Sequence, residues 1–358
     1  MKQSLIYLLL ILFTSCQNDS DKIQGRWIEK DNFTNSNTLE IHDFYFKYNA
    51  GYEKGERLYH YDNDTFYVSN FNQIHKTIIK IDNDQMRLID TESDTLMSTF
   101  EKFYLKDIVD YFNQKKKTSI SLPKLNSDIT NNFSCHNTVY ADYTNDSLIL
   151  FLNGVRHDLS DNSYLLVEQK DYEKNWRLII DKNIKVHDIK RIKTELRKAQ
   201  QKIICFAVYN QNDSLINLAF RLPPIEVPGG PPLPPQLPDS LTSNKSKNIL
   251  IDITQDSITI DTKQILPNQL KENLSKLIYE NDYIIVTVTF DEQLMYKHYI
   301  KHLSKIKSAF AEARNKFAIE NFHVSDYMDL DHDDARKVDK RFSLKIKEHS
   351  FAKNNNLN

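Results

Sequence analysis

The chain has 358 residues, 40% of them hydrophobic, and a net charge of −2 at pH 7. This length exceeds what one core usually supports, so we expect two or three domains. The near-neutral charge gives no electrostatic footprint for nucleic acid, and we expect no such partner. After residue 13 no stretch approaches 18 continuous apolar residues, so the sequence predicts no membrane-spanning helix.

Residues 1–15 are predicted to be a secretory signal peptide. Lys2 precedes an apolar run over residues 5–13, and two small polar residues then lead into Cys16. As a helix this run would rise about 14 Å, against a hydrocarbon core of ~30 Å. The ending resembles a bacterial lipobox, although Phe13 stands where leucine is usual. The resemblance implies that Cys16 is acylated and anchors the mature chain in a membrane. An ordinary signal peptide that happens to end on a cysteine is the alternative.

Residues 16–22 form the lipidated cysteine and a polar spacer. Gln17 stands where an aspartate marks inner-membrane retention in many Gram-negative lipoproteins, so the outer membrane is the preferred location. The acidic residues 18–21 resemble surface-export signals of the Bacteroidetes type, which leaves the periplasmic and the surface face open.

Residues 23–105 carry short alternating segments at intervals of roughly ten residues, separated by Asp- and Asn-rich turns. This spacing predicts an antiparallel meander that closes into a small barrel. The Gly25-x-Trp27 start and the evenly spaced hairpins resemble bacterial lipocalin-like domains. The resemblance implies a structural role for Gly25 and Trp27, with the tryptophan closing the barrel floor. Such a barrel can hold one apolar small molecule or be filled by its own side chains, and we favour the filled barrel.

Residues 106–117 are predicted to be a short amphipathic or linker segment, after which the chain repeats itself at an offset of 110. Asp146-Ser147-Leu148 matches Asp256-Ser257-Ile258, and residues 178–181 match 288–291, each ending on an aspartate. Two landmarks with equal spacing indicate an internal repeat. The units are expected at 118–221 and 245–325, each with a hairpin, helices on one face and a further strand, the second unit's last strand being near 317–322. The fold class is therefore α+β: a small antiparallel barrel followed by two two-layer sandwiches.

The repeated pattern resembles the periplasmic domain of the ExbD/TolR family. Residues 120–123, 150–154 and the strand–Asp181–helix–strand succession through residue 208 carry this resemblance. It implies a tendency to dimerise or to bind an extended envelope peptide, accessory to TonB/Tol-type transport. The transmembrane helix that precedes this domain in proton-coupled members is missing, so the energising chemistry is not expected.

Residues 222–244 form a proline-rich linker between the units, predicted to be a polyproline II spacer and, less so, a ligand for an aromatic groove. Ser240 lies there in an Asp-Ser-Leu triplet similar to a bacterial O-glycosylation sequon. Residues 326–358 are charged and predicted to be a flexible tail.

Candidate chemistry is sparse. Asp329, Asp331 and Asp333 begin a calcium-loop pattern that fails where glycine and glutamate are needed. His298 and His302 stand one helical turn apart without an evident third ligand, so we expect an exposed helix face. Asp181 and Asp291 follow strands and precede helices, which suits N-capping or turn formation rather than catalysis.

Besides Cys16, the chain holds Cys135 and Cys205. These two could pair in an oxidising envelope, but each is expected to be a small buried hydrophobe. With no nucleophile–base pattern, metal or cofactor motif, the sequence predicts a non-catalytic envelope lipoprotein that binds or scaffolds protein partners. A carrier of an apolar ligand in the barrel is the alternative, and the partner's identity stays open.

Overall fold

The computed structural model describes most of the chain outside its N-terminus, the proline-rich linker and several loops. The described residues are 24–30, 38–42, 45–49, 54–62, 65–70, 73–82, 85–91, 95–102, 105–126, 135, 137–144, 147–158, 175–199, 201–222, 247–281 and 283–349. The fold is a mixed α+β fold with three sheets. Two compact units are present: residues 1–118 with 134–138 and 152–155, and the remaining residues.

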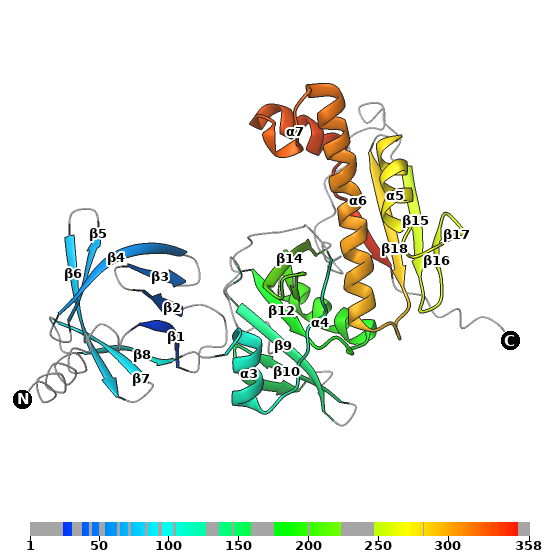
Figure 1. Ribbon diagram of the computed structural model, residues 1–358. Coiled ribbons are helices and arrows are strands. Elements are labelled where there is room, and N and C mark those ends of the chain that lie inside the picture. The colour runs from blue at the N-terminus through cyan, green and yellow to red at the C-terminus, as the bar shows by residue number, and fades with distance from the viewer. Residues whose placement is uncertain are drawn as a thin grey trace, which may run out of the picture. The chain divides into compact units, whose positions relative to one another are not determined.

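The first sheet is an eight-stranded closed barrel in sequential order, as the spacing predicts (Figure 1). Its strands are β1 (Gly25–Glu29), β2 (Thr38–Ile41), β3 (Tyr45–Asn49), β4 (Lys54–Asp62), β5 (Thr65–Asn70), β6 (Gln73–Asp82), β7 (Gln85–Asp90) and β8 (Leu96–Lys102). Strand β1 pairs antiparallel with both β2 and β8 and so closes the ring. A barrel has no free sheet edge to pair with other chains.

Apolar side chains pack inside the described part of the barrel. They are Trp27, Ile41, Ile79, Met86 and Phe100, with Leu39, Ile81 and Leu88 against them. Trp27 is buried, and the Nζ of Lys102 lies 5.4 Å from the centroid of its ring. Gly25 has φ +116°, a region that side chains rarely adopt. The expected structural roles of Gly25 and Trp27 therefore have a local physical reason.

The segment after the barrel is a helix, α3 (Ile108–Lys116), within the expected amphipathic or linker stretch. The side chain of Asp107 caps it by accepting from Val109 N and Asp110 N. Its apolar residues are buried, and Lys115 forms a 2.6 Å ion pair with Glu101 of β8.

The second sheet has the order β11-β10-β9-β12-β13-β14. Its strands are β9 (Asn137–Thr144), β10 (Ser147–Leu152), β11 (Val155–Asp158), β12 (Trp176–Ile180), β13 (Ile203–Tyr209) and β14 (Leu215–Arg221), and α4 (Val186–Lys198) joins β12 to β13. Such a strand–helix–strand connection makes β12 and β13 parallel. All five residues of β12 are buried. Four are apolar, and the fifth, Arg177, donates from Nε to Asn217 Oδ1 at 3.1 Å.

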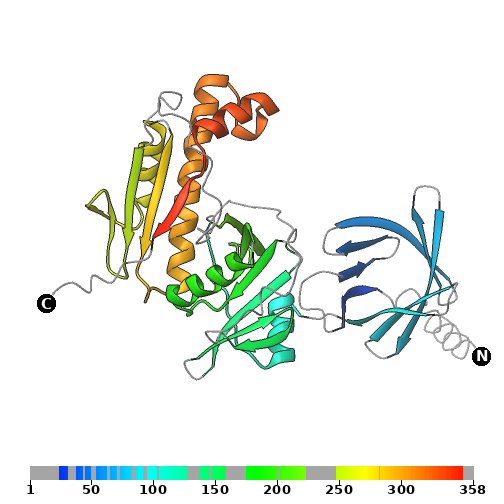
Figure 2. The ribbon, with the colours of Figure 1, turned by 180° about the vertical axis from the view of Figure 1, so that it is seen from behind.

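The third sheet has the order β17-β16-β15-β18-β19. Its strands are β15 (Lys247–Ile253), β16 (Ile258–Ile260), β17 (Lys263–Ile265), β18 (Ile284–Phe290) and β19 (Ile346–His349), and its helices include α5 (Leu270–Tyr279) and α6 (Tyr296–Phe322). Both helices lie on one face of this sheet (Figures 1 and 2). We call residues 119–221 the first copy and 247–349 the second copy.

The hairpins of the two copies match more closely in geometry than in numbering. Asn153 and Asp261 both have a positive φ, and their side chains accept from Thr138 N and Leu250 N respectively. The offset is thus 112 in the first strand and 108 in the second. Each strand of the first hairpin is two residues longer than its equivalent in the second hairpin. The offset therefore falls from 112 before the hairpin tip to 108 after it, and equals 110 at the tip itself. A shift of two residues keeps every side chain on its original face.

The end of the second copy differs from the sequence prediction. Residues 317–322 are not a strand but the last turns of α6, in which no glycine or proline interrupts the chain. The strand equivalent to β13 is β19, which pairs parallel with β18 and lies beside it in Figure 2. In the chain, the short helix η2 (Tyr327–Asp329) and α7 (His332–Arg341) lie between α6 and β19.

The flexible tail expected from residue 326 is therefore wrong for residues 326–349. The apolar residues Val338 and Phe342 are buried, and the Arg314 side chain of α6 donates to the Phe342 carbonyl at 2.8 Å. This burial holds a segment whose composition alone resembles a solvated tail. Residues 350–358 lie outside the described residues.

Cys135 and Cys205 are both buried, as expected, and both are disulfide-bonded. The sequence left this pairing open and favoured two free thiols. A disulfide persists in an oxidising compartment and is rare in the cytosol.

Candidate functional site: the joint between the two copies

The first copy meets the second through a short antiparallel bridge at the start of their long helices. Lys185 pairs with Met295, its own equivalent at offset 110. Four backbone hydrogen bonds surround this pair, from Val186 N to Leu294 O (2.8 Å), Tyr296 N to Ile184 O (2.7 Å), His187 N to Glu292 O (3.0 Å) and Lys297 N to Lys182 O (3.1 Å). Each bond has a reciprocal partner at offset 110. We call residues 182–187 and 292–297 the joint.

Reciprocity of this kind is what a two-fold axis requires. In an isologous contact, residue i of one unit touches residue j of the other, and j of the first touches i of the second. Lys185 and Met295 lie on the axis because each faces its own equivalent. The joint is therefore pseudo-symmetric, although it lies within a single chain.

The joint is shaped by the two aspartates that the sequence singled out. The Asp181 carboxylate accepts from Asn183 N at 2.9 Å, and that of Asp291 accepts from Gln293 N at 2.8 Å. Both are Asx turns, which fold the chain back two residues after each strand. The turn interpretation is confirmed for both residues. Neither is a helix N-cap, because those positions belong to Lys185 and Met295.

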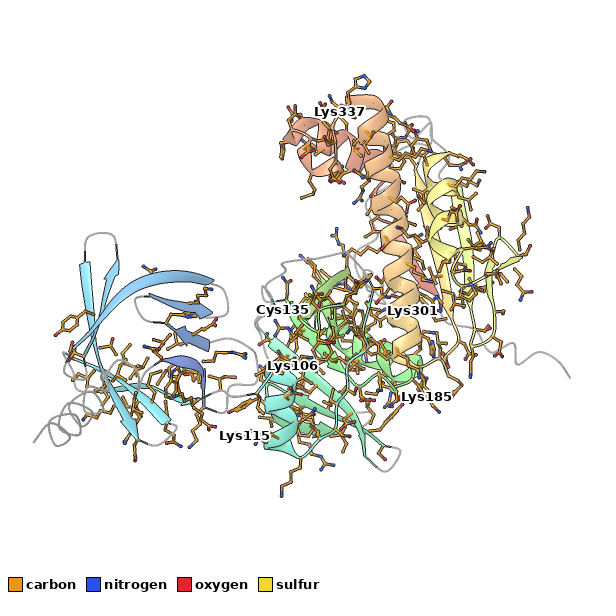
Figure 3. The ribbon with its side chains drawn as sticks, in the orientation of Figure 1. Lys106, Lys115, Cys135, Lys185, Lys301 and Lys337 are labelled. Atoms are coloured by element: carbon orange, nitrogen blue, oxygen red, sulfur yellow. The ribbon has the colours of Figure 1, made fainter. Side chains whose placement is uncertain are left out.

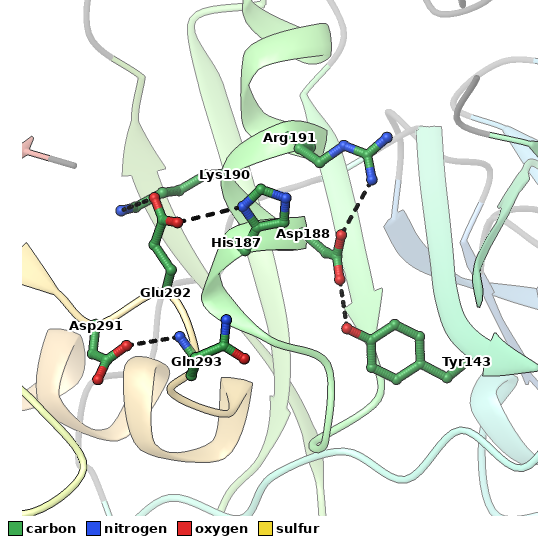
Figure 4. A network of polar contacts seen from close by, with 8 residues as sticks. All are labelled: Tyr143, His187, Asp188, Lys190, Arg191, Asp291, Glu292 and Gln293. Atoms are coloured by element: carbon green, nitrogen blue, oxygen red, sulfur yellow. Dashed lines mark hydrogen bonds and ion pairs between the residues drawn. The ribbon is translucent and has the colours of Figure 1, made fainter. Parts of the chain in front are cut away.

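The side chains of the joint are not symmetric. On one side Glu292 faces His187 Nδ1 at 3.6 Å and Lys190 Nζ at 3.8 Å (Figure 4). Burial lowers the pKa of Lys190, and the nearby Glu292 acts in the opposite direction. On the other side the equivalent positions hold Lys182 and Lys297, two cations. The pseudo-symmetric backbone thus carries an attractive charge pattern on one side alone.

Tyr143 adds a second polar contact to the first copy. Its hydroxyl donates to the Asp188 carboxylate at 2.5 Å and accepts from Lys185 N at 3.3 Å, while Arg191 lies 3.4 Å from the other Asp188 oxygen (Figure 4). Burial and the Asp188 carboxylate raise the pKa of Tyr143 to about 12. The longer first hairpin carries Tyr143 over the start of α4, so the second copy has no equivalent tyrosine.

An aromatic cluster lies beneath the joint and belongs to both copies. The ring of Phe206 in β13 lies 5.8 Å from Tyr296 and 5.9 Å from Tyr299, both on α6. Tyr299 also contacts Phe290 of β18 at 4.7 Å. Tyr296, Tyr299, Phe206 and Phe290 are all fully buried. The two copies therefore share core residues.

Polar contacts at Glu348 also join the two copies beside this aromatic cluster. Lys193 of α4 forms a 2.6 Å ion pair with Glu348 of β19, and the Tyr299 hydroxyl donates to the same carboxylate at 3.1 Å. Neighbour pairing makes Glu348 the equivalent of Phe206, since Leu178 faces Phe206 and Val288 faces Glu348. An aromatic ring in the first copy is thus replaced by a carboxylate in the second. The ring contacts aromatic side chains of α6, and the carboxylate contacts the ammonium group of Lys193.

The other residues singled out by sequence do not join this site. Cys16 and Ser240 lie outside the described residues, so lipidation and glycosylation stay predictions. Gly25 and Trp27 belong to the barrel. Tyr143, Asp188, Lys190 and Glu292 were not anticipated, because no motif links residues so far apart in the chain.

The two candidate metal patterns have structural explanations. The side chains of Asp329 and Asp331 cap backbone amides at η2 and α7. His302 is buried rather than on an exposed helix face, and burial lowers its pKa to about 4. His298 is exposed, as expected. Within the described ranges no cluster of three His, Cys, Asp or Glu side chains could hold a metal ion.

Figure 3 draws the side chains of the described residues. It labels Lys185 at the joint and Lys301 on the first half of α6. Among the described helices none is long and apolar enough to cross a membrane. No family model, curated protein or solved structure matches this chain.

Proposed function

We propose that this chain is a non-catalytic, lipid-anchored envelope protein that binds an extended segment of a protein partner. The observation that carries the proposal is the edge of the third sheet. In the first copy β13 is flanked by β12 and, on its other side, by β14. Its equivalent β19 has β18 as its single neighbour among the described strands. A strand edge with free backbone groups is a template for pairing with another chain.

The first copy indicates how such a segment would bind. Strand β14 runs antiparallel to β13, with Phe220 opposite Ile204 and Leu218 opposite Phe206. A partner in the equivalent position would run antiparallel to β19, opposite Ile346 and Glu348. This mode agrees with the extended envelope peptide that the resemblance to ExbD/TolR domains implies, accessory to TonB/Tol-type transport.

The proposed location rests on two further observations. The disulfide-bonded state of Cys135 and Cys205 suits an oxidising envelope compartment. The short apolar run that ends at Cys16 supports lipid anchoring, with the outer membrane preferred. The alternative of an apolar ligand in the barrel is less favoured, because Trp27, Met86 and their neighbours fill its described interior.

A photo-reactive residue tests the binding edge in the native envelope. Placed at the exposed Lys347 of β19, it should cross-link one discrete envelope protein. The matched control is the same residue at Lys337 of α7, which is also exposed and is labelled in Figure 3. Equal capture at both positions, or none at Lys347, would contradict the proposal.

Anchoring is tested separately. Cys16→Ala should leave the chain unacylated and move it from the detergent phase to the aqueous phase. Protease accessibility on intact cells then distinguishes the surface from the periplasmic face. Unchanged partitioning of the variant would rule out the lipid anchor and leave the binding edge untouched.

A further inference from the structure

The joint has the geometry of a subunit interface, yet both of its halves belong to one chain. Lys185 faces its own equivalent Met295, and the surrounding backbone bonds occur in reciprocal pairs. Two units that meet by chance along a chain have no reason to meet through the same residues. Reciprocal contacts arise when a self-complementary surface pairs with itself.

We infer that the joint is a two-fold dimer interface enclosed within a single chain, in which the second copy takes the place of a second subunit. The homodimer that the sequence suggested is in this way built into the monomer. The shared aromatic cluster supports the inference, since Tyr299 of the second copy is fully buried between Phe206 and Phe290. Buried aromatic anchors of this kind dominate the energetics of interfaces.

The charges of the joint disfavour pairing between two first copies. If two first copies paired, Lys185 would face Lys185, and each Lys182 would take the position of Glu292 beside His187 and Lys190. Like charges at these distances repel, on both sides of the axis. In the observed arrangement the apolar Met295 faces Lys185, and Glu292 supplies the opposite charge. Repulsion therefore disfavours a pair of first copies, and attraction favours the observed pair.

The linker favours the same outcome. Copies joined by the proline-rich residues 222–244 meet as an intramolecular event, at an effective concentration that short linkers raise to about millimolar. At micromolar protein the closed single chain should outcompete exchange with a second chain. We therefore expect a monomer by light scattering, and a dimer would overturn the assignment of the joint to one chain.

A cut in the linker tests the interface directly. A protease site inserted between Gly229 and Gly230 allows the folded full-length chain to be nicked, and both disulfide-bonded cysteines precede this cut. The two fragments should remain one species with the mass of the intact chain under non-denaturing conditions. Their separation at micromolar concentration would overturn the inference.

Charge reversal tests the selection. Glu292→Lys should raise the dissociation constant of the nicked fragments about tenfold, because two attractions become repulsions. The matched control is Glu280→Lys at the end of α5, outside the joint, which should change it less than about twofold. Combining Glu292→Lys with Lys190→Glu should restore part of the affinity. Equal effects of Glu292→Lys and the control, or no rescue, would show that charge does not select the pair.

Discussion

The two copies follow the same chain path and differ in what completes each of them. Both begin with a hairpin, continue through a buried strand to an Asx turn, and meet at the joint through equivalent backbone groups. The first copy is completed by β14 and a disulfide-bonded Cys205, the second by α7 and an ion pair at Glu348. Backbone pairing is thus kept where side chains have diverged, because main-chain hydrogen bonds depend little on residue type.

The equivalence of Phe206 and Glu348 shows how such divergence is tolerated. Phe206 meets the aromatic rings of α6, whereas Glu348 meets the ammonium group of Lys193 and the hydroxyl of Tyr299. A partly buried carboxylate is costly without such partners. Each copy's sheet therefore depends on a helix of the other copy, and the predictions below test that dependence.

The largest effect is expected from Tyr299→Ala. Removing this fully buried ring leaves a cavity that borders both sheets and should lower the free energy of unfolding by about 3–5 kcal/mol. Because Phe206 and Phe290 both lose a contact, the copies should melt together in one shifted calorimetric transition. Tyr299→Phe is the control that removes only the hydroxyl. Melting of one copy while the other keeps its wild-type transition would show that the cores are independent.

The second-largest effect is expected from removing the disulfide, because Cys205 of the first copy is disulfide-bonded and its equivalent in the second copy is not a cysteine. Its equivalent position in the second copy holds Lys347, since Arg177 pairs with Cys205 and Thr287 with Lys347. Cys205→Ser should lower the free energy of unfolding by about 2–4 kcal/mol in denaturant titrations. Reductant should destabilise the wild type similarly and leave the variant unchanged. An unaffected wild type under reductant would show that the bond does not contribute to stability.

Sequence reasoning found the parts of this fold whose signal is local. Strand spacing predicted the barrel, and the aspartates at equal intervals predicted the matched turns at Asp181 and Asp291. The last strand of the second copy was misplaced, because α6 continues over 317–322 and the inserted α7 delays β19. Composition described that insertion as a tail, since the burial of Val338 depends on tertiary contacts.

The joint itself could not be predicted from the sequence. Its defining bonds join backbone groups, which no side-chain pattern encodes. The contacts of Tyr143 with Asp188 and of Glu292 with His187 join residues more than 40 positions apart. Tyr143 reaches Asp188 because the first hairpin is longer than the second, and the equal offset of 110 at the hairpin tips conceals that difference.

The Tyr143–Asp188 contact should make the stability of the first copy depend on alkaline pH. The folded pKa of Tyr143 is about 12, above the unfolded value of 10.0. The folded state therefore keeps its proton longer, and this contribution is fully present below pH 10 and lost as pH rises through about 12. Denaturant titrations between these limits should show a steeper loss for the wild type than for Tyr143→Phe. Identical slopes would show that the hydroxyl is not specifically protected.

The smallest effect should come from Lys182→Glu, which would make the two sides of the joint alike. Lys297 N donates to the Lys182 carbonyl, and His187 N donates in the same way to the Glu292 carbonyl. A glutamate at position 182 would therefore face Lys297 in the way that Glu292 faces His187. One partly exposed ion pair is worth about 0.2–1 kcal/mol, and the gain should shrink in high salt. The measurement is the midpoint of denaturation at low and high salt, with Lys263→Glu in the exposed strand β17 as the matched charge control. A gain no larger than that of the control would mean that the pseudo-symmetry of the backbone does not extend to the side-chain positions around the axis.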